Sequence, residues 1–269
     1  MTRTNTRRLI FLVVFLGVAL PLIFNIDLTH HATPETRQAY TNIESLPDSA
    51  IVLVSFDFEA SSWAEIKPLA EVLLAHVFAR NLRVVGVSLF AEGTTLGEQI
   101  LAAIAAEKGR EYGVDYCYLG YRPQYVAAIL GMGESITAEF PADYYGAPTK
   151  NLPLFADLHN YDQVNLVISI ADGSMPTYWT EYAVAPYGVN LEVALTATMA
   201  TAYYPYLSSG QISGLLAGLK GAAEYELLLK QAGGGKRGLF AQSVSQVVIM
   251  LVIIAGNVAD YFRRRKPWK

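Results

Sequence analysis

Residues 163–176, QVNLVISIADGSMP, decide the fold of this 269-residue chain. They begin with a run of apolar and β-branched residues, which is typical of a strand buried on both faces of a parallel sheet. The run ends in a turn from Asp172 to Ser174, and the proline that follows suits the first turn of a helix. A second apolar run, residues 51–56, ends in the same way in Asp57 and Glu59. We therefore expect the two runs to be neighbouring strands in the centre of the domain.

Apolar runs alternate with helical patterns five times between residues 50 and 231. The expected strands are residues 51–56, 83–89, 114–119, 164–171 and 191–197. Such alternation predicts a parallel sheet with right-handed crossovers and helices on both faces. We predict an α/β fold with a five-stranded, mainly parallel, Rossmann-like doubly wound sheet of order 3-2-1-4-5. In that order, strands one and four are adjacent at the point where the order reverses.

The composition indicates membrane segments. Apolar residues make up 52% of the chain and charged residues 16%, so it is more apolar and less charged than an ordinary soluble domain. Residues 9–26 and 239–262 are each apolar and long enough to cross a hydrocarbon core of about 30 Å. The first segment has an alternative interpretation as a cleaved signal peptide, although no small-residue cleavage site follows it. We expect N- and C-terminal transmembrane helices that flank the α/β domain.

Basic residues next to these segments set the expected topology, because Lys and Arg favour the cytoplasmic side. Residues 1–8 contain three of them, and residues 263–269 contain five. We predict a two-pass protein of the cytoplasmic (inner) membrane, with both terminal tails in the cytoplasm. Residues 27–49 are expected to form a tether, residues 50–231 an extracytoplasmic domain, and residues 232–238 a hinge.

The central part of the chain is acidic. Residues 25–235 hold 10 Lys and Arg against 23 Asp and Glu, which gives this part a net charge near −13. An acidic domain argues against nucleic acid as a partner and against docking on anionic lipid. The lipid bilayer is the expected partner through the two apolar segments. Cys117 is the single cysteine, so we predict neither a disulfide nor a thiolate metal site.

Polar residues at the ends of the first and fourth strands define a candidate site. Doubly wound sheets bind ligands at the C-terminal strand ends beside the reversal point, which here predicts a crevice lined by Asp57, Glu59, Asp172 and Ser174. The three carboxylates could hold a divalent cation for metal-assisted hydrolysis of a phosphoester or another ester. The simpler alternative is that these short polar residues complete turns and cap helices. The haloacid dehalogenase pattern would need a second aspartate in place of Glu59.

Recognisable catalytic motifs are missing from the sequence. The turn after the first strand, DFEASSW at residues 57–63, lacks the glycines of a dinucleotide fingerprint, and no Walker A motif is present. The four histidines have no metal-ligand spacing, and no serine lies in a nucleophile elbow. We therefore assign no catalytic residue and predict no cofactor; a divalent cation belongs only to the hydrolase alternative.

A glycine repeat marks a candidate interface. Gly210, Gly214 and Gly218 recur every four residues within residues 208–231, which we expect to form the last long helix of the domain. Small residues along one helix face allow another backbone to approach closely. Packing against the domain's own sheet and contact with a second subunit both agree with this pattern.

Three segments resemble an uncharacterised family of bacterial membrane-anchored proteins. They are VLVSFDFEASS (52–62), YGVDYCYLGYRP (112–123) and PYLSSGQISGLLAGLKGAAEYE (205–226), and the resemblance covers about residues 50–230. It implies a Rossmann-like extracytoplasmic domain and carries no activity. Glycines often follow the second motif in that family; Gln124 and Tyr125 stand there in this chain, which puts anion binding by that turn in doubt.

These observations favour a non-catalytic binding or assembly subunit of a membrane complex. We expect it to be a homo-oligomer or to associate with other membrane-protein subunits. Two alternatives use the same crevice: the metal-dependent hydrolase and a small-molecule sensor domain.

Overall fold

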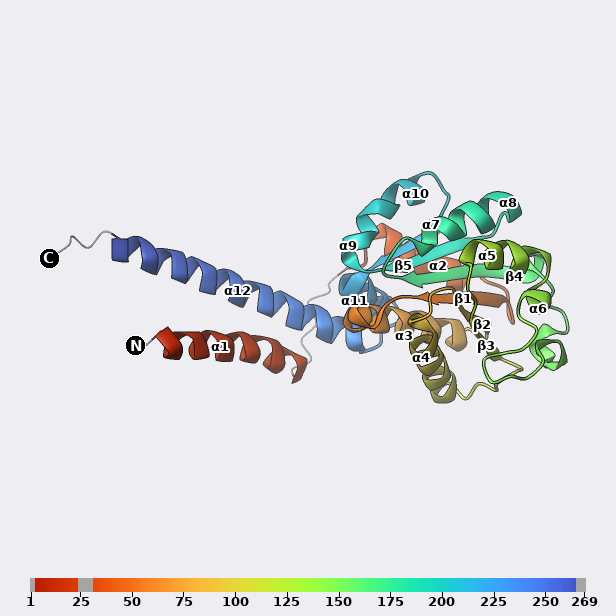
Figure 1. Cartoon of the computed structure of the whole chain (residues 1–269), viewed down its shortest axis with the longest axis horizontal. Helices are drawn as coiled ribbons and strands as arrows, with labels where there is room; N and C mark the ends of the chain where they lie inside the picture. The colour runs from red at the N-terminus through yellow and green to blue at the C-terminus, as the bar shows by residue number, and fades with distance from the viewer. Residues whose placement is uncertain (1–2, 24–30, 265–269) are drawn as a thin grey trace. The chain divides into compact units, whose positions relative to one another are not determined.

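The computed structural model describes residues 3–23 and 31–264 and divides into two compact units (Figure 1). One unit is His31–Gly235, and the other combines Met1–His30 with Lys236–Lys269. The tails predicted at residues 1–8 and 263–269 lie partly outside the described residues.

The unit His31–Gly235 is built on a parallel sheet of order β3-β2-β1-β4-β5-β6. Its strands are β1 (Ile51–Asp57), β2 (Arg83–Ser88), β3 (Tyr116–Tyr121), β4 (Val164–Ala171), β5 (Leu191–Leu195) and β6 (Gly214–Ala217). The α/β class and the predicted order of the first five strands are confirmed. The predicted strand number is wrong, because the sheet has six strands and not five.

The register of β1 explains why the candidate residues meet. Asp57, the last residue of β1, pairs with Ala171, the last residue of β4. The two strands therefore end level with each other, and Asp172 follows on the same edge of the sheet. Every residue of β1 is buried, as expected for a central strand covered on both faces.

Helices cover both faces of the sheet, as predicted (Figure 1). One hydrophobic cluster lies under α5 (Tyr125–Glu134), α7 (Met175–Trp179) and α8 (Ala185–Tyr187). The other lies under α2 (Pro34–Glu44), α3 (Trp63–Ala79), α4 (Gly93–Glu107) and α11 (Gly218–Leu228). The connecting elements are η1 (Ala60–Ser62), α6 (Ile136–Glu139), η2 (Thr149–Asn151), η3 (Pro153–Phe155), η4 (Tyr161–Gln163), the π-helical turn η5 (Thr180–Val184), α9 (Ala197–Ala200), η6 (Thr201–Tyr203) and α10 (Tyr204–Ser208).

The long helix predicted at residues 208–231 is wrong, because this segment contains strand β6 and the shorter helix α11. Gly210 and Gly218 have φ angles of +75° and +54°, a left-handed conformation that interrupts a helix and that glycine tolerates best. Gly214 lies in β6, where an added Cβ would come within 2.8 Å of the Ala39 Cβ. The three glycines therefore do not share one helix face, and the stated basis for the predicted interface is lost.

The tether predicted at residues 27–49 is also wrong over α2. Pro34 occupies the first turn of this helix, and Ala39 and Ile43 are buried against the sheet. Glu224 of α11 accepts hydrogen bonds from the Thr33 backbone N–H and hydroxyl, at 2.9 and 2.7 Å. Residues 24–30 of the predicted tether and first span lie outside the described residues. The segment just before the first strand is thus part of the folded unit.

A close helix–strand contact holds the end of β1 on the face of the sheet that α4 covers. Gly93 and Gly97 of α4 face Phe56, and a Cβ added at Gly97 would lie 2.6 Å from the Phe56 Cβ. At Gly93 the added atom would collide with the Phe56 carbonyl oxygen. These two glycines, four residues apart on α4, allow the close helix packing that we had expected of Gly210, Gly214 and Gly218.

The second unit contains helices α1 (Arg3–Ile23) and α12 (Gly234–Arg264), and the first two residues of α12 belong to the α/β unit. Among the described residues, one helix is long and apolar enough to cross a membrane: Gly234–Tyr261, which contains an 18-residue stretch with a mean hydropathy of 2.1. In α1 the described apolar part, residues 9–23, is shorter than the roughly 20 residues that a span needs. The predicted hinge at residues 232–238 is helical from Gly234 onward.

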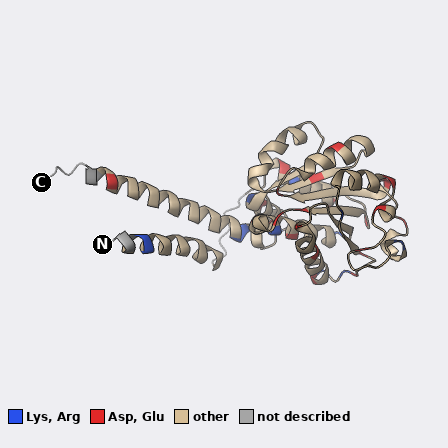
Figure 2. Cartoon of the chain, in the orientation of Figure 1, with Lys and Arg blue, Asp and Glu red and all other residues tan. Residues whose placement is uncertain are grey.

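Within this unit, α1 and α12 contact each other. A Cβ added at Gly17 would lie 3.1 Å from a methyl group of Val248. Figure 2 shows Lys and Arg at the beginning of each helix and an acidic residue near the end of α12, with uncharged residues between. The charged residues of α12 therefore lie near its two ends, and the stretch between them is uncharged, as a membrane span requires.

Candidate functional site

A pocket of about 520 Å³ opens at the C-terminal edge of the sheet, where the strand order reverses between β1 and β4. All four residues of the predicted crevice line it. The complete lining is Asp57, Glu59, Ser61, Ser62, Phe90, Tyr125, Asp172, Gly173, Ser174, Met175, Tyr178, Thr196 and Thr198. Its volume lies in the range of about 300–1,000 Å³ that is usual for small-molecule sites.

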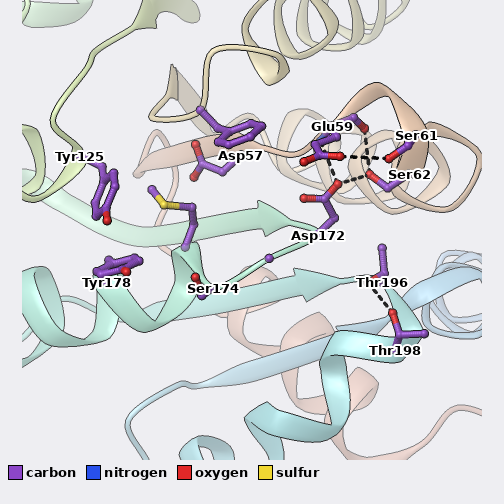
Figure 3. A pocket seen from close by; sticks show the side chains of 13 residues that line it. Asp57, Glu59, Ser61, Ser62, Tyr125, Asp172, Ser174, Tyr178, Thr196 and Thr198 are labelled. Carbon is purple, nitrogen blue, oxygen red and sulfur yellow. Dashed lines mark hydrogen bonds between the residues drawn. The ribbon is translucent and has the colours of Figure 1, made fainter.

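Asp172 connects the loops that follow the two central strands (Figure 3). Its Oδ2 accepts hydrogen bonds from the Glu59 backbone N–H at 2.8 Å and from the Ser62 hydroxyl at 2.5 Å. Ser62 is the last residue of η1, the turn between β1 and α3. The loop after β4 therefore fixes the conformation of the loop after β1, which is the turn-completing role that the simpler interpretation predicted.

Asp57 is buried below the pocket, with only 2% of its surface exposed. Its Oδ2 accepts a hydrogen bond from the Ser55 hydroxyl at 2.5 Å, and its Oδ1 accepts one from the Leu89 backbone N–H at 2.7 Å. Burial raises the pKa of this carboxyl to about 6, and the hydrogen bonds from Ser55 and Leu89 oppose that rise. One oxygen thus binds Ser55 within β1, and the other binds Leu89, the residue that follows β2.

This arrangement bears on the hydrolase hypothesis. Among the described residues, no group of three or more His, Cys, Asp or Glu side chains is placed to hold a metal ion. Both oxygens of Asp57 and one oxygen of Asp172 already accept protein hydrogen bonds. Glu59 is exposed, and its Oε2 accepts a hydrogen bond from the Ser61 hydroxyl at 3.3 Å. The carboxylates are arranged as acceptors for protein donors.

Two tyrosines form the opposite end of the pocket (Figure 3). Tyr125 begins α5 and Tyr178 lies in α7, and their ring centroids are 4.5 Å apart. Figure 3 shows this pair at one end, Glu59 and Asp172 at the other, and Asp57 between them. Our crevice prediction missed both tyrosines. The sequence signal that could have found them is their position: each lies in the first or second turn of a helix that follows a strand, and therefore near the C-terminal edge of the sheet.

Hydroxyl groups complete the polar side of the pocket. Ser174 is exposed after β4, and Thr196 and Thr198 follow β5 with their Oγ1 atoms 3.2 Å apart. The two threonines were also missed, because Thr196 was placed inside the strand expected at residues 191–197 and Thr198 in the connection that follows it. The structure ends that strand at Leu195, so Thr196 belongs to the loop that borders the site.

The lining has one sign of charge. Asp57, Glu59 and Asp172 are acidic, and none of the described residues that line the pocket is Lys, Arg or His. The polar groups available to a ligand are therefore carboxylate and hydroxyl oxygens together with aromatic ring faces.

No protein-family model matches this chain, and no curated protein matches it. Its class is therefore defined by the fold and the site. It is a doubly wound α/β unit of six parallel strands with a pocket at the reversal point, followed by one helix with the length and composition of a membrane span.

Proposed function

We propose that this protein is a membrane-anchored, non-catalytic binding subunit that holds its ligand in the pocket between the β1 and β4 loops. The observation that carries the proposal is the pocket of about 520 Å³ at the reversal point, with Asp57, Glu59, Asp172 and Ser174 in its lining. Open α/β sheets bind ligands at this position. The internal hydrogen bonds of Asp57 and Asp172 hold the pocket in shape before a ligand arrives, which lowers the entropic cost of binding.

The lining supports recognition better than chemistry. The hydroxyl of Ser62 donates to Asp172 with no imidazole between them, so this pair lacks the base that activates a serine nucleophile. Asp57 is buried, and its two oxygens are engaged within the protein. We therefore retain the small-molecule sensor as a second form of the same proposal and do not advance the hydrolase.

The membrane part of the proposal is a two-pass anchor. Residues 9–26 would form the first span and α12 the second, with both tails in the cytoplasm and the α/β unit outside the cytoplasmic membrane. Support comes from the three basic residues in 1–8, the five in 263–269 and the apolar length of α12. Gln242 and Gln246 place two amides in α12, and such groups favour contact with other helices, either of a second copy or of another subunit.

Retained ligands test the binding function. The full chain is extracted from its native membrane in a mild detergent and studied by native mass spectrometry, with identification of any bound molecules and chains. We expect the wild-type protein to retain a small molecule that Ser174→Trp loses, because the exposed Ser174 lines the pocket and an indole would fill it. Ala127→Trp, an exposed position of α5 outside the pocket, is the matched control. A bare wild-type monomer without ligand or partner would contradict the proposal.

Cysteine labelling tests the topology. The only natural cysteine, Cys117, is fully buried, so intact cells give a low background with a membrane-impermeant maleimide. We expect Ala156→Cys, an exposed site of the α/β unit, to react from outside and Lys269→Cys to react only after lysis. Labelling of Lys269→Cys alone in intact cells would reverse the proposed orientation.

A further inference from the structure

The charge of the pocket restricts the ligands that it can accept. An anionic ligand such as a phosphate would meet Asp57, Glu59 and Asp172 and no basic side chain among the described lining residues. Like charges brought together in a partly desolvated pocket repel, and the low dielectric of such a site strengthens the repulsion. A neutral ligand avoids that repulsion but leaves the carboxylates without a counter-charge. A cation is the ligand class whose charge compensates this arrangement.

Two carboxylate oxygens remain available for such a ligand. Both hydrogen bonds to Asp172 end on its Oδ2, and the hydrogen bond to Glu59 ends on its Oε2. Figure 3 shows both side chains extending from their loops toward the middle of the pocket. Oδ1 of Asp172 and Oε1 of Glu59 can therefore accept hydrogen bonds from a primary ammonium group, or attract a quaternary one by charge alone, without breaking the contacts that shape the loops.

The aromatic end of the pocket suits the carbon atoms of the same ligand. Tyr125 and Tyr178 form a pair of rings 4.5 Å apart, and Phe90 is 37% exposed at the pocket. Aromatic faces attract alkylammonium groups within about 6 Å of the ring centroid and also bury methylene groups. A compact organic cation can contact both ends of the pocket, whereas a bare metal ion would leave the tyrosines without a role.

We propose that the pocket binds a small organic cation, a primary or quaternary amine, between Glu59 and Asp172 on one side and Tyr125 and Tyr178 on the other. This inference rests on the proposed binding function and adds the chemical class of the ligand. Nothing in the lining requires the amine to react, so the protein recognises it and releases it unchanged.

Matched pairs of cationic and neutral probes test the charge requirement. The full chain is placed in phosphatidylglycerol nanodiscs, whose lipid supplies no amine, and titrated calorimetrically with choline and with putrescine. The neutral controls are 3,3-dimethylbutan-1-ol and butane-1,4-diol, which have nearly the same shapes without charge. We expect at least one cation to bind ten-fold or more tightly than its neutral counterpart, and inorganic phosphate to give no binding.

Three variants locate the binding. Glu59→Gln should weaken binding of the cation about five- to ten-fold, and Tyr178→Leu should weaken it by a similar factor. Glu92→Gln, an exposed carboxylate outside the pocket, should leave the affinity unchanged. Equal weakening by Glu92→Gln would show that the cation responds to the general acidity of the unit, and this result would overturn the proposal.

The remaining outcomes separate the ligand class from the binding function. Equal affinity for the charged and neutral probes, binding of phosphate, or absence of binding by both cations would overturn the proposed class. If the wild-type protein nevertheless retains a native small molecule that Ser174→Trp loses, the binding function stands and only the class is wrong. If it retains none and binds no probe, both proposals fail.

Discussion

Two buried acids on opposite faces of the sheet have opposite surroundings. Asp57 is 2% exposed, and hydroxyl and backbone N–H groups donate to both of its oxygens. Glu192 of β5 is 1% exposed, and neither of its oxygens has a hydrogen-bond partner. Burial raises the pKa of Glu192 to about 8, and the nearby Asn42 amide reduces this rise. The hydrogen bond that the Asn42 amide makes goes to the Ser213 carbonyl, so the Glu192 carboxyl has no donor of its own.

The position of each acid along its strand explains this difference. Asp57 ends β1, where the backbone N–H groups of the next loops are not used by the sheet and can donate to a carboxylate. Glu192 lies within β5, paired on one side with Ile168 and on the other with Gly214, and the strand ladder uses the neighbouring backbone groups. A strand end can stabilise a carboxylate that a strand interior only buries. This is one physical reason why the candidate site lies at the strand ends.

Removing the unpartnered acid should have the largest effect on stability. Glu192→Met deletes a carboxyl that is protonated in the folded state up to about pH 8 and ionised in the unfolded chain above about pH 4.5. The folded state binds the extra proton in this window, so wild-type stability falls as the pH rises from 4.5 to 8. We expect the variant to be more stable at pH 8 by on the order of 3 kcal/mol. The groups that face this site are Asn42 of α2 and Tyr225 of α11, and Glu192 raises the pKa of that tyrosine.

Melting temperatures of the full chain in detergent at pH 5 and pH 8 measure this effect. The gain at pH 8 corresponds to a rise of roughly 6–12 °C for a unit of this size, and it should shrink toward pH 5. Glu92→Met removes an exposed carboxylate and serves as the control with no pH-dependent gain. A Glu192→Met protein that melts at the wild-type temperature at both pH values would mean that the carboxyl is solvated or partnered in solution.

The partnered acid should respond in the opposite direction. Asp57→Ala leaves the Leu89 N–H and the Ser55 hydroxyl without their acceptor inside the protein. An unsatisfied buried donor costs about 1–3 kcal/mol, so we expect a loss of about 2 kcal/mol near pH 7. Burial raises the pKa of Asp57 from an ordinary value of 3.8 to about 6. The stability that the wild-type protein loses through this carboxyl as the pH rises is therefore lost between these two pH values, below the window of Glu192. Thermal melting between pH 4 and pH 8 separates the two acids, and a stabilising Asp57→Ala would remove the distinction between them.

The same contrast between strand interiors and strand ends decides what the sequence could predict. Residues 51–56 and 164–171 are mainly apolar runs followed by polar residues, so the central strands, their order and the four crevice residues could be derived from pattern alone. β6 was missed because its four residues, GLLA, lie between glycines and continue the apparent helical repeat. α2 was missed because only two of its apolar residues, Ala39 and Ile43, are buried, so its sequence has no long apolar pattern.

The rest of the pocket depends on three-dimensional facts that a linear pattern does not contain. Tyr125 and Tyr178 belong to helices that follow β3 and β4, and their meeting depends on the direction in which each helix leaves the sheet. Thr196 enters the lining only because β5 ends at Leu195, two residues before the end of the expected strand. Glu192 could be read as a polar residue of an edge strand, and its burial follows from the unexpected β6 beside it and α2 above it.

A packing variant tests how the end of β1 is held from the face opposite Asp57. In Gly97→Ala, the new methyl group would lie 2.6 Å from Cβ and Cγ of Phe56, so α4 must move away from the strand. Overpacking of this kind typically costs about 1–3 kcal/mol, and the better helix propensity of alanine returns up to about 1 kcal/mol. We expect a net loss of about 1 kcal/mol in urea or thermal unfolding. Gly173→Ala, where an added Cβ meets nothing within 4 Å, is the control. Equal stability of the two variants would show that α4 adjusts without strain.

The smallest effect should come from the exposed side of the same strand end. Ser62→Ala removes one of the two donors to Asp172, but the Glu59 N–H still donates to it, and the partly exposed carboxylate can accept a hydrogen bond from water. A single replaceable hydrogen bond is worth about 0.5–1.5 kcal/mol, so we expect a loss of less than about 1 kcal/mol and a change in melting temperature of only a few degrees. Because the loop after β1 then keeps only one of its two hydrogen bonds to Asp172, choline or putrescine should bind more weakly even though stability hardly changes. A loss as large as that of Asp57→Ala would mean that the Ser62–Asp172 contact belongs to the buried network and is not an adjustable wall of the pocket.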